Sequence, residues 1–192
     1  MRMFVALYPS QEVIAHLAGL LRPLQTTRES EAEATPSIRW IPPERWHITL
    51  AFLAEVDPDR VEHLQESLSE VAAQHGSLQG LHLTGAGAFG STVWVGVDPT
   101  DPGTPAEALA KAVQRASRSA GIEVERRPWR AHLSIARVRT HDRAERQSRT
   151  AALVSRLAVY SGPTWTATDI TLVHSILGPQ PEHMSVGRYA LG

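Results

Sequence analysis

The stretches His47-Ile48-Thr49-Leu50-Ala51 and His132-Leu133-Ser134-Ile135-Ala136 share one pattern: histidine, apolar residue, hydroxyl residue, apolar residue, alanine. In a β-strand, side chains two positions apart point to the same face of the sheet. Each histidine is therefore expected to share a face with the hydroxyl residue that follows it, while the aliphatic residues between them point to the core. Both stretches are predicted to be strands whose polar face suits an active-site cleft.

Three further His-x-Ser or His-x-Thr tripeptides show that the tripeptide alone is weak evidence. His75 falls at an expected helix end, and the strand that would follow His82 is interrupted by a glycine. His183 lies on a predicted, alternating strand and remains a rival. A structural histidine is the alternative reading for each. The motif pair is favoured by its similar upstream flanks, Arg39-Trp40 and Arg127-Pro128-Trp129.

Periodicity and turn residues predict an α+β protein. Ser10, Asp57-Pro58 and the capping box of Thr104 and Glu107 mark three helix starts, and residues 142–158 form a fourth helix. The order of elements in the second half echoes the first, which predicts two similar lobes, each with a mainly antiparallel sheet and helices. Residues 1–192 are expected to form a single bilobal domain. The predicted strands cover residues 2–8, 38–41, 46–53, 78–89, 92–97, 122–125, 130–138, 165–177 and 183–191.

Composition excludes several classes of protein. Of the 192 residues, 42% are hydrophobic and 20% are charged, which fits a folded domain and rules out general disorder. The lack of cysteine excludes disulfides, a thiolate nucleophile and cysteine-ligated metals. No apolar run reaches the roughly 20 residues that span a bilayer, and no signal peptide is recognisable. A cytoplasmic protein without a membrane partner is expected.

Charge is unevenly distributed along the chain. Residues 1–110 hold 6 arginines against 14 acidic residues, whereas residues 111–156 hold 11 arginines and one lysine against 4 acidic residues. The basic segment could face a phosphate-bearing partner, and the alternative is a helix with a solvated arginine face. The acidic stretch 26–37 is expected to be a loop.

The segments RWIPPERWHITLAFL (39–53) and RPWRAHLSIARV (127–138), with the start MRMFVALYP (1–9), resemble the 2H phosphoesterase superfamily. They are most similar to its LigT/ThpR branch, the RNA 2′,3′-cyclic phosphodiesterases, and the resemblance covers nearly the whole chain. It implies a bilobal α+β fold with the two motifs facing each other across a central groove. It also implies hydrolysis of the 2′,3′-cyclic phosphate of RNA ends or nucleotides to a 2′-phosphate.

The same resemblance implies the site residues. His47 and Thr49 match the first motif, and His132 and Ser134 match the second, with Ser134 at a place where relatives often have threonine. Arg137 matches an arginine that contacts phosphate and base.

Phe52 matches an aromatic residue that packs against the nucleobase, and its alternative role is core packing. Phe52 and Arg137 each lie five positions after a motif histidine, so strict alternation points both away from the site. They reach a nucleotide only if each strand bends. Relatives often carry tyrosine near the position of His183, and this departure leaves that strand without an assigned role.

The chemistry can also be argued from the residues alone. Opening a cyclic phosphodiester requires an activated water on one side of the phosphorus and a protonated leaving oxygen on the other. Histidine titrates near pH 6.5, so two imidazoles can supply both functions at neutral pH. Hydroxyls and a guanidinium can hold the non-bridging oxygens. This division of roles needs no metal or cofactor, and neither motif strand carries a carboxylate ligand.

From the resemblance, His47 is expected to protonate the leaving O3′ and His132 to activate water. Two alternatives use the same site: 2′-5′ RNA ligation, and opening of a cyclic phosphate on an ADP-ribose-type nucleotide. A third is a nucleotide- or RNA-binding module without turnover. Trp40, Trp46 and Trp129 are expected either to stack on bases or to wedge the lobes together. The protein is expected to be a monomer.

Overall fold

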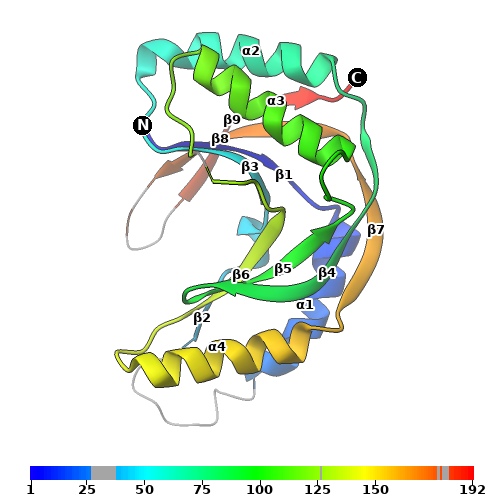
Figure 1. Cartoon of the computed structure of the whole chain (residues 1–192), viewed down its shortest axis with the longest axis vertical. Coiled ribbons are helices and arrows are strands. Elements are labelled where there is room, and N and C mark those ends of the chain that lie inside the picture. Colours follow the sequence, from blue (N-terminus) through cyan, green and yellow to red (C-terminus); the bar gives the residue numbers. More distant parts are fainter. Residues whose placement is uncertain (27–37, 126, 177, 179–181) are drawn as a thin grey trace.

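The computed structural model describes residues 1–26, 38–125, 127–176, 178 and 182–192. Four α-helices and nine strands lie within these residues (Figure 1). The loop expected at 26–37 lies outside the described residues, apart from Thr26, which ends the first helix. The helices are α1 (Gln11–Thr26), α2 (Val61–Ala73), α3 (Pro105–Ser119) and α4 (Arg143–Leu157), and two short 3-10 helices are η1 (Pro43–Arg45) and η2 (Pro58–Arg60). The strands are β1 (Met3–Leu7), β2 (Ile38–Trp40), β3 (Ile48–Leu53), β4 (Leu78–Phe89), β5 (Thr92–Asp98), β6 (His132–Val138), β7 (Ser161–Ala167), β8 (Asp169–Ile176) and β9 (Glu182–Ala190).

The described strands form one curled antiparallel sheet in the order β7-β4-β5-β6-β3-β1-β8-β9, with β2 paired beside β6. The α+β class is confirmed. The expected separate sheet for each lobe is corrected, because the sheet is continuous through β3 and β6. These two motif strands share a single register pair, Ile48 with Leu133. The junction between the halves of the sheet is therefore narrow.

Each half of the sheet takes strands from both halves of the sequence. β8 and β9 join β1 and β3, whereas β4 and β5 join β6 and β7. In Figure 1, α2 and α3 cover the first of these halves, and α1 and α4 cover the second. The two halves of the sheet therefore do not coincide with the repeated halves of the sequence.

The helices bury the apolar stripes that predicted them. In α3, the Thr104 hydroxyl accepts a hydrogen bond from the Glu107 backbone N–H, which confirms Thr104 as the N-cap, whereas the Glu107 carboxylate accepts from Gly103, one residue before the position that a capping box requires. Full burial of one leucine side chain stabilises a fold by about 1.5–3 kcal/mol. The buried stripe residues include Val13, Leu17, Leu21, Leu64, Leu68, Leu109, Val113, Leu153 and Leu157.

Strand β1 is buried on both faces. Met3, Val5 and Leu7 belong to the main core beneath the helices. Phe4 and Ala6 form a second, small apolar cluster on the opposite face, together with Val173. This second cluster makes the face of the sheet next to His47 apolar, because Phe4 stacks on the His47 ring.

Three predicted strands have different bounds. Residues 122–125 make only an isolated bridge, between Leu53 and Val124. The strand expected at 165–177 is two strands, β7 and β8, which belong to different halves of the sheet. The strand expected at 46–53 begins at Ile48, because the Trp46 indole N–H donates to the Ile41 carbonyl and holds the preceding residues in a turn. None of the helices described is long and apolar enough to span a membrane.

Candidate active site

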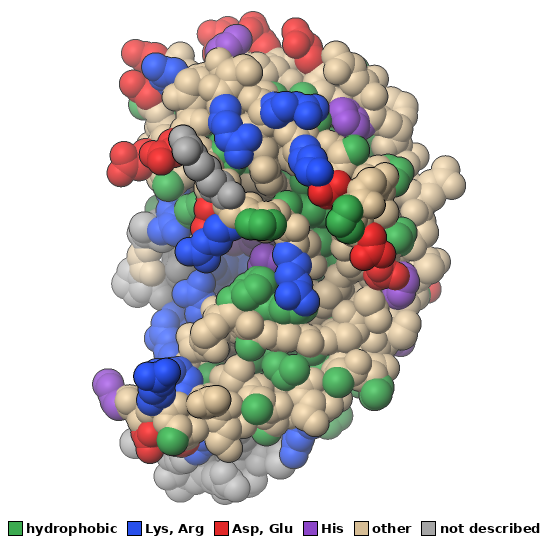
Figure 2. Space-filling model, viewed as in Figure 1, with side chains coloured by type: hydrophobic (Ala, Val, Ile, Leu, Met, Phe, Trp, Pro, Cys, Tyr) green, Lys and Arg blue, Asp and Glu red, His purple; other side chains and the backbone are tan. Residues whose placement is uncertain are grey.

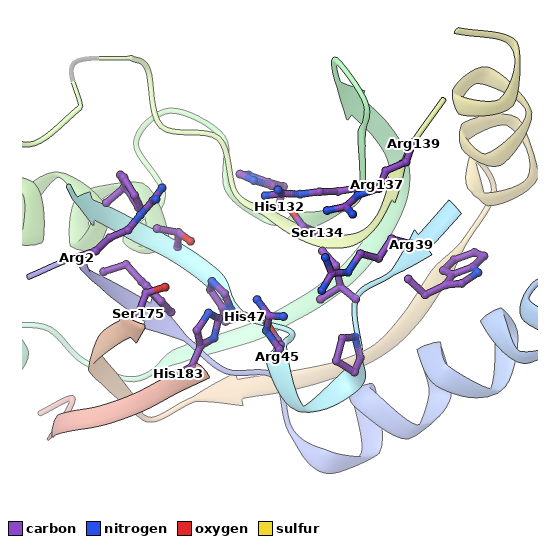
Figure 3. Close-up of a pocket in the computed structure, with 16 residues that line it drawn as sticks. Arg2, Arg39, Arg45, His47, His132, Ser134, Arg137, Arg139, Ser175 and His183 are labelled. Carbon is purple, nitrogen blue, oxygen red and sulfur yellow. Dashed lines mark hydrogen bonds between the residues drawn. The ribbon is translucent and has the colours of Figure 1, made fainter. Parts of the chain in front are cut away.

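A cavity of about 610 Å³ lies where β3 and β6 meet. Figure 3 shows His132 and Ser134 on β6, with His47 immediately before β3 on the facing side. Adjacent strands thus bring together two motifs that are distant in the sequence. The cavity is lined by all six residues expected at the site: His47, Thr49, Phe52, His132, Ser134 and Arg137.

Both motif strands carry a β-bulge at the same motif position. Leu50 and Ile135, each three positions after the histidine, are extra residues without a register partner in the neighbouring strand. A bulge shifts the alternation of side chains by one. As a result, Phe52 and Arg137 line the cavity although strict alternation would point them away. Both strands therefore contain the irregularity that Phe52 and Arg137 need in order to reach the site.

The two motif histidines make equivalent hydrogen bonds. Nδ1 of His47 lies 2.7 Å from the backbone oxygen of Arg45, and Nδ1 of His132 lies 2.8 Å from that of Arg130. A carbonyl oxygen only accepts hydrogen bonds, so Nδ1 carries the hydrogen in both rings. In the neutral rings, Nε2 is then the nitrogen with a free lone pair. Each ring is held by the backbone two residues upstream and keeps one nitrogen for acid–base chemistry.

His47 sits in an aromatic enclosure. Its ring stacks on Phe4, with centroids 4.5 Å apart and an interplanar angle of 18°, and His183 contacts it edge-on at 5.4 Å. The pKa of His47 is lowered to about 4, mainly by burial and to a smaller extent by the charges of His183, Arg45 and His132, while the hydrogen bond to the Arg45 backbone opposes the shift. His47 is therefore neutral at pH 7 in the free protein.

His132 has a different enclosure. Phe89 meets its ring edge-on at 5.0 Å, and Trp94 lies 6.0 Å away. Burial also lowers the pKa of His132, with a smaller lowering from the charge of Arg130 and an opposing effect of the backbone hydrogen bond. Phe89 is 46% exposed, so the enclosure of His132 is in part a solvent-exposed side chain. The Arg130 guanidinium lies over the Trp94 ring at 4.6 Å.

Arginine is the dominant charge of the cavity. Among the described residues that line it, there is no aspartate or glutamate. In the space-filling view, blue Lys and Arg side chains border the hollow on this face (Figure 2). A concave surface with one sign of charge concentrates ligands of the opposite sign. The arginines of the lining are Arg2, Arg39, Arg45, Arg137 and Arg139.

Sequence reasoning missed part of this lining. The rival His183 lies beside His47 in the cavity, whereas His75 and His82 are not part of the lining. The signal for His183 was present in its tripeptide and its strand pattern. Nothing in the sequence places Arg2 beside the site, because β1 reaches the cavity only through its pairing with β3 and β8.

Some of the aromatic residues expected near the site line the cavity, and others pack within the protein. The Arg2 guanidinium lies over the Phe52 ring at 4.7 Å, so one face of that ring is covered. Trp40 lines the cavity, but Trp46 is 1% exposed. Trp129 donates its indole N–H to the Thr49 backbone oxygen at 2.8 Å and so holds β3 in place. Trp46 and Trp129 thus stabilise the motif strand.

Comparisons with known proteins identify the family. The 2′-5′ RNA ligase superfamily profile matches residues 9–179. The chain is 28% identical over 165 residues to the RNA 2′,3′-cyclic phosphodiesterase of Geobacillus stearothermophilus, covering 83% of this chain and 50% of that protein. It therefore spans about half the length of that relative. It is also 28% identical over 185 residues to the RNA 2′,3′-cyclic phosphodiesterase of Archaeoglobus fulgidus, covering 94% of each chain.

The fold has matches among solved structures. E. coli LigT in its apo form superposes with a TM-score of 0.72 at 18% identity, covering 99% of this chain and 96% of LigT. LigT has also been solved in complex with 3′-AMP. The motif pair, the curled sheet and the profile match over most of the chain agree, and the chain belongs to the 2′-5′ RNA ligase superfamily, the 2H phosphoesterases.

Proposed function

We propose that the protein hydrolyses the 2′,3′-cyclic phosphate of RNA ends or nucleotides to a 2′-phosphate. The observation that carries this proposal is the arrangement of His47 and His132. Two equivalently held imidazoles share one arginine-lined cavity with the hydroxyls of Thr49 and Ser134. The names of the relatives and the LigT complex with 3′-AMP support a nucleotide ligand.

In this mechanism, water attacks phosphorus and the P–O3′ bond breaks. One histidine accepts the proton of the attacking water at Nε2, and the other donates a proton to O3′. The products are a 2′-phosphomonoester and a free 3′-hydroxyl. Thr49, Ser134 and Arg137 bind the non-bridging oxygens while negative charge develops on them. The reaction requires no metal or cofactor, because two histidines supply the acid and the base.

The resemblance assigns the acid to His47 and the base to His132, and we keep this order in the proposal. The low pKa of His47, about 4, adds a condition: the anionic substrate must raise it before His47 can hold a proton near neutrality. A phosphate beside the ring favours the charged imidazolium and so acts in that direction. The base does not have this requirement, since burial lowers the pKa of His132 and so favours the neutral form that accepts a proton.

In this proposal, the nucleobase binds at the Phe52 end of the cavity. Arg2 covers one face of Phe52, so the base stacks on the guanidinium of Arg2 or on the remaining edge of the ring. The cavity draws residues from both halves of the sheet. We therefore propose that the functional unit is the single two-lobed domain of residues 1–192, acting as a monomer.

The test is to incubate the purified protein with adenosine 2′,3′-cyclic phosphate and with cleaved tRNA halves, in the presence of a chelator. Resolving the product by chromatography should show adenosine 2′-phosphate as the sole product. A 3′-phosphate would contradict the expected bond cleavage, and joined tRNA halves without hydrolysis would assign the site to 2′-5′ ligation. Turnover of an ADP-ribose-type cyclic phosphate alone would move the proposal to that substrate. Binding without turnover would leave a nucleotide-binding module.

A further inference from the structure

The arginines are not spread evenly around the two histidines. In Figure 3, Arg39, Arg137 and Arg139 lie on one side of the motif histidines, and Arg2 lies on the other side with Ser175. Arg39 and Arg137 are direct register partners on β2 and β6. Side chains directly opposite each other in an antiparallel pair have Cβ atoms about 4.5–5.5 Å apart, and like charges there are destabilising. Arg139 stands two positions beyond Arg137, on the same side.

This arginine cluster, defined as Arg39, Arg137 and Arg139, is accessible. All three side chains are exposed, and all three line the cavity. Within the described part of the chain, neither Arg137 nor Arg139 forms an ion pair with a carboxylate. A fourth guanidinium, that of the half-buried Arg45, has a buried Nε without a hydrogen-bond partner in the same cavity. Arg137 and Arg139, two like charges in one cavity without a carboxylate partner among the described residues, indicate a site for an anion.

The scissile phosphate does not need this many cations. A cyclic phosphodiester carries a single negative charge, and the mechanism above already gives it two hydroxyls and Arg137. Arg45 also lies close enough to His47 and His183 for its charge to lower the pKa of both. Arg39 and Arg139 are therefore in excess of what the reacting group can use.

The chemistry of the substrate says where a second anion must come from. A nucleotide whose 2′ and 3′ oxygens are closed in a cyclic phosphate joins the rest of its strand only through O5′. The next negative charge is the phosphate on that oxygen. It is either the phosphodiester of an RNA strand or the 5′-phosphate of a mononucleotide.

Resting on the proposed function, we propose that Arg139, with Arg39 on the same side of the cavity, binds the 5′-side phosphate of the terminal nucleotide, while Arg137 stays with the scissile phosphate. The enzyme then prefers RNA ends and 5′-phosphorylated nucleotides to nucleosides that carry the cyclic phosphate alone. Charge-assisted hydrogen bonds from guanidinium to phosphate supply the preference. The preference weakens with added salt, because the phosphate contact is exposed.

The experiment compares kcat/KM for four substrates with the wild-type protein. They are adenosine 2′,3′-cyclic phosphate, its 5′-phosphorylated form, the ApA dinucleotide 2′,3′-cyclic phosphate, and the same dinucleotide with a neutral methylphosphonate linkage. The expected result is at least about a tenfold gain from the second phosphate, the scale of one charge-assisted hydrogen bond. The methylphosphonate should lose that gain. The second and third substrates distinguish a free 5′-phosphate from a strand phosphodiester.

Matched variants locate the effect. Arg139→Gln should reduce the preference to near one, whereas Arg2→Gln removes the same charge from the opposite side of the cavity and should keep the preference. Equal kcat/KM for all four substrates would overturn the inference, as would a gain that survives in the methylphosphonate or equal losses in both variants.

A binding measurement separates this inference from the proposed function. If none of the four substrates is hydrolysed, the proposed function fails, and equilibrium binding still decides the subsite. Adenosine 3′,5′-bisphosphate should bind the wild-type protein about tenfold more tightly than adenosine 3′-phosphate, and Arg139→Gln should abolish the difference. Equal affinities in the wild-type protein would contradict the subsite.

Discussion

The first and second motifs occupy equivalent places on either side of the junction between β3 and β6. In each, Nδ1 of the histidine binds the carbonyl two residues upstream, and a bulge follows three residues later. Their surroundings differ. His47 is stacked on Phe4 and contacted by His183, whereas His132 meets the edge of the half-exposed Phe89.

This difference teaches that the motif sets the geometry and the neighbours set the proton affinity. Burial lowers the pKa of both histidines, and for His47 the value reaches about 4. Two residues with the same hydrogen bond thus differ in how readily they hold a proton. Pairs of titratable groups whose environments differ in this way suit opposite roles in acid–base catalysis.

The largest expected effect is on turnover. His47→Ala and His132→Ala should each lower kcat for a 2′,3′-cyclic phosphate by about 10²–10⁴-fold, because each removes one positioned acid or base. His82→Ala is the matched control, since His82-Leu83-Thr84 has the same tripeptide on β4 but does not line the cavity. Steady-state kinetics at pH 7 measures all three. A wild-type rate in either motif variant would contradict the claim that both histidines take part in catalysis.

The second effect is on the free energy of unfolding, and it tests whether His47 is more strongly affected by burial than His132. Unfolded His47 takes up a proton near pH 6.5, but the folded protein resists until about pH 4. Between these values the unfolded state binds more protons, so the free energy of unfolding falls as the pH is lowered. The contribution of His47 is about 3 kcal/mol, fully present above pH 6.5 and lost as the pH approaches 4.

Urea unfolding at pH 7 and pH 4.5 checks this expectation. His47→Gln should lose less stability between the two pH values than the wild-type protein, and His132→Gln should show a smaller improvement. If His132→Gln flattens the pH dependence more than His47→Gln does, the order of burial is the reverse of the one described.

The third effect concerns the two hydroxyls. Thr49→Val and Ser134→Ala should each lower kcat by about tenfold with little change in KM, because each hydroxyl bonds an oxygen whose charge grows in the transition state. Similar losses would support a phosphate held symmetrically between the motifs. A loss confined to KM would instead assign the hydroxyls to ground-state binding.

The smallest effect tests the third histidine. A charge on His183 lowers the pKa of His47. His183→Gln should therefore raise the pKa of His47, and NMR titration of the His47 ring resonances measures the change. The pKa of His132 should stay unchanged, since His183 is not among the groups that shift it. An equal shift in both rings would indicate a general rearrangement of the cavity.

The sequence was most informative where local patterns act alone. The motif strands, the hairpin between β4 and β5, and the N-cap of α3 follow from alternation and turn chemistry. The arrangement of strands did not follow, because the pairing of β8 with β1 is a long-range choice that leaves no local pattern. The bulges at Leu50 and Ile135 were also beyond a period-two argument. They reversed the expected direction of Phe52 and Arg137.

Cooperation between the two sides is tested most directly by a double-variant kinetic cycle on adenosine 2′,3′-cyclic phosphate. Residues that act as one unit show strongly non-additive losses. We predict that His47→Ala combined with His132→Ala has a kcat close to that of the slower single variant. Losses that multiply in the double variant, so that each histidine contributes independently of the other, would contradict a shared reaction at one phosphate.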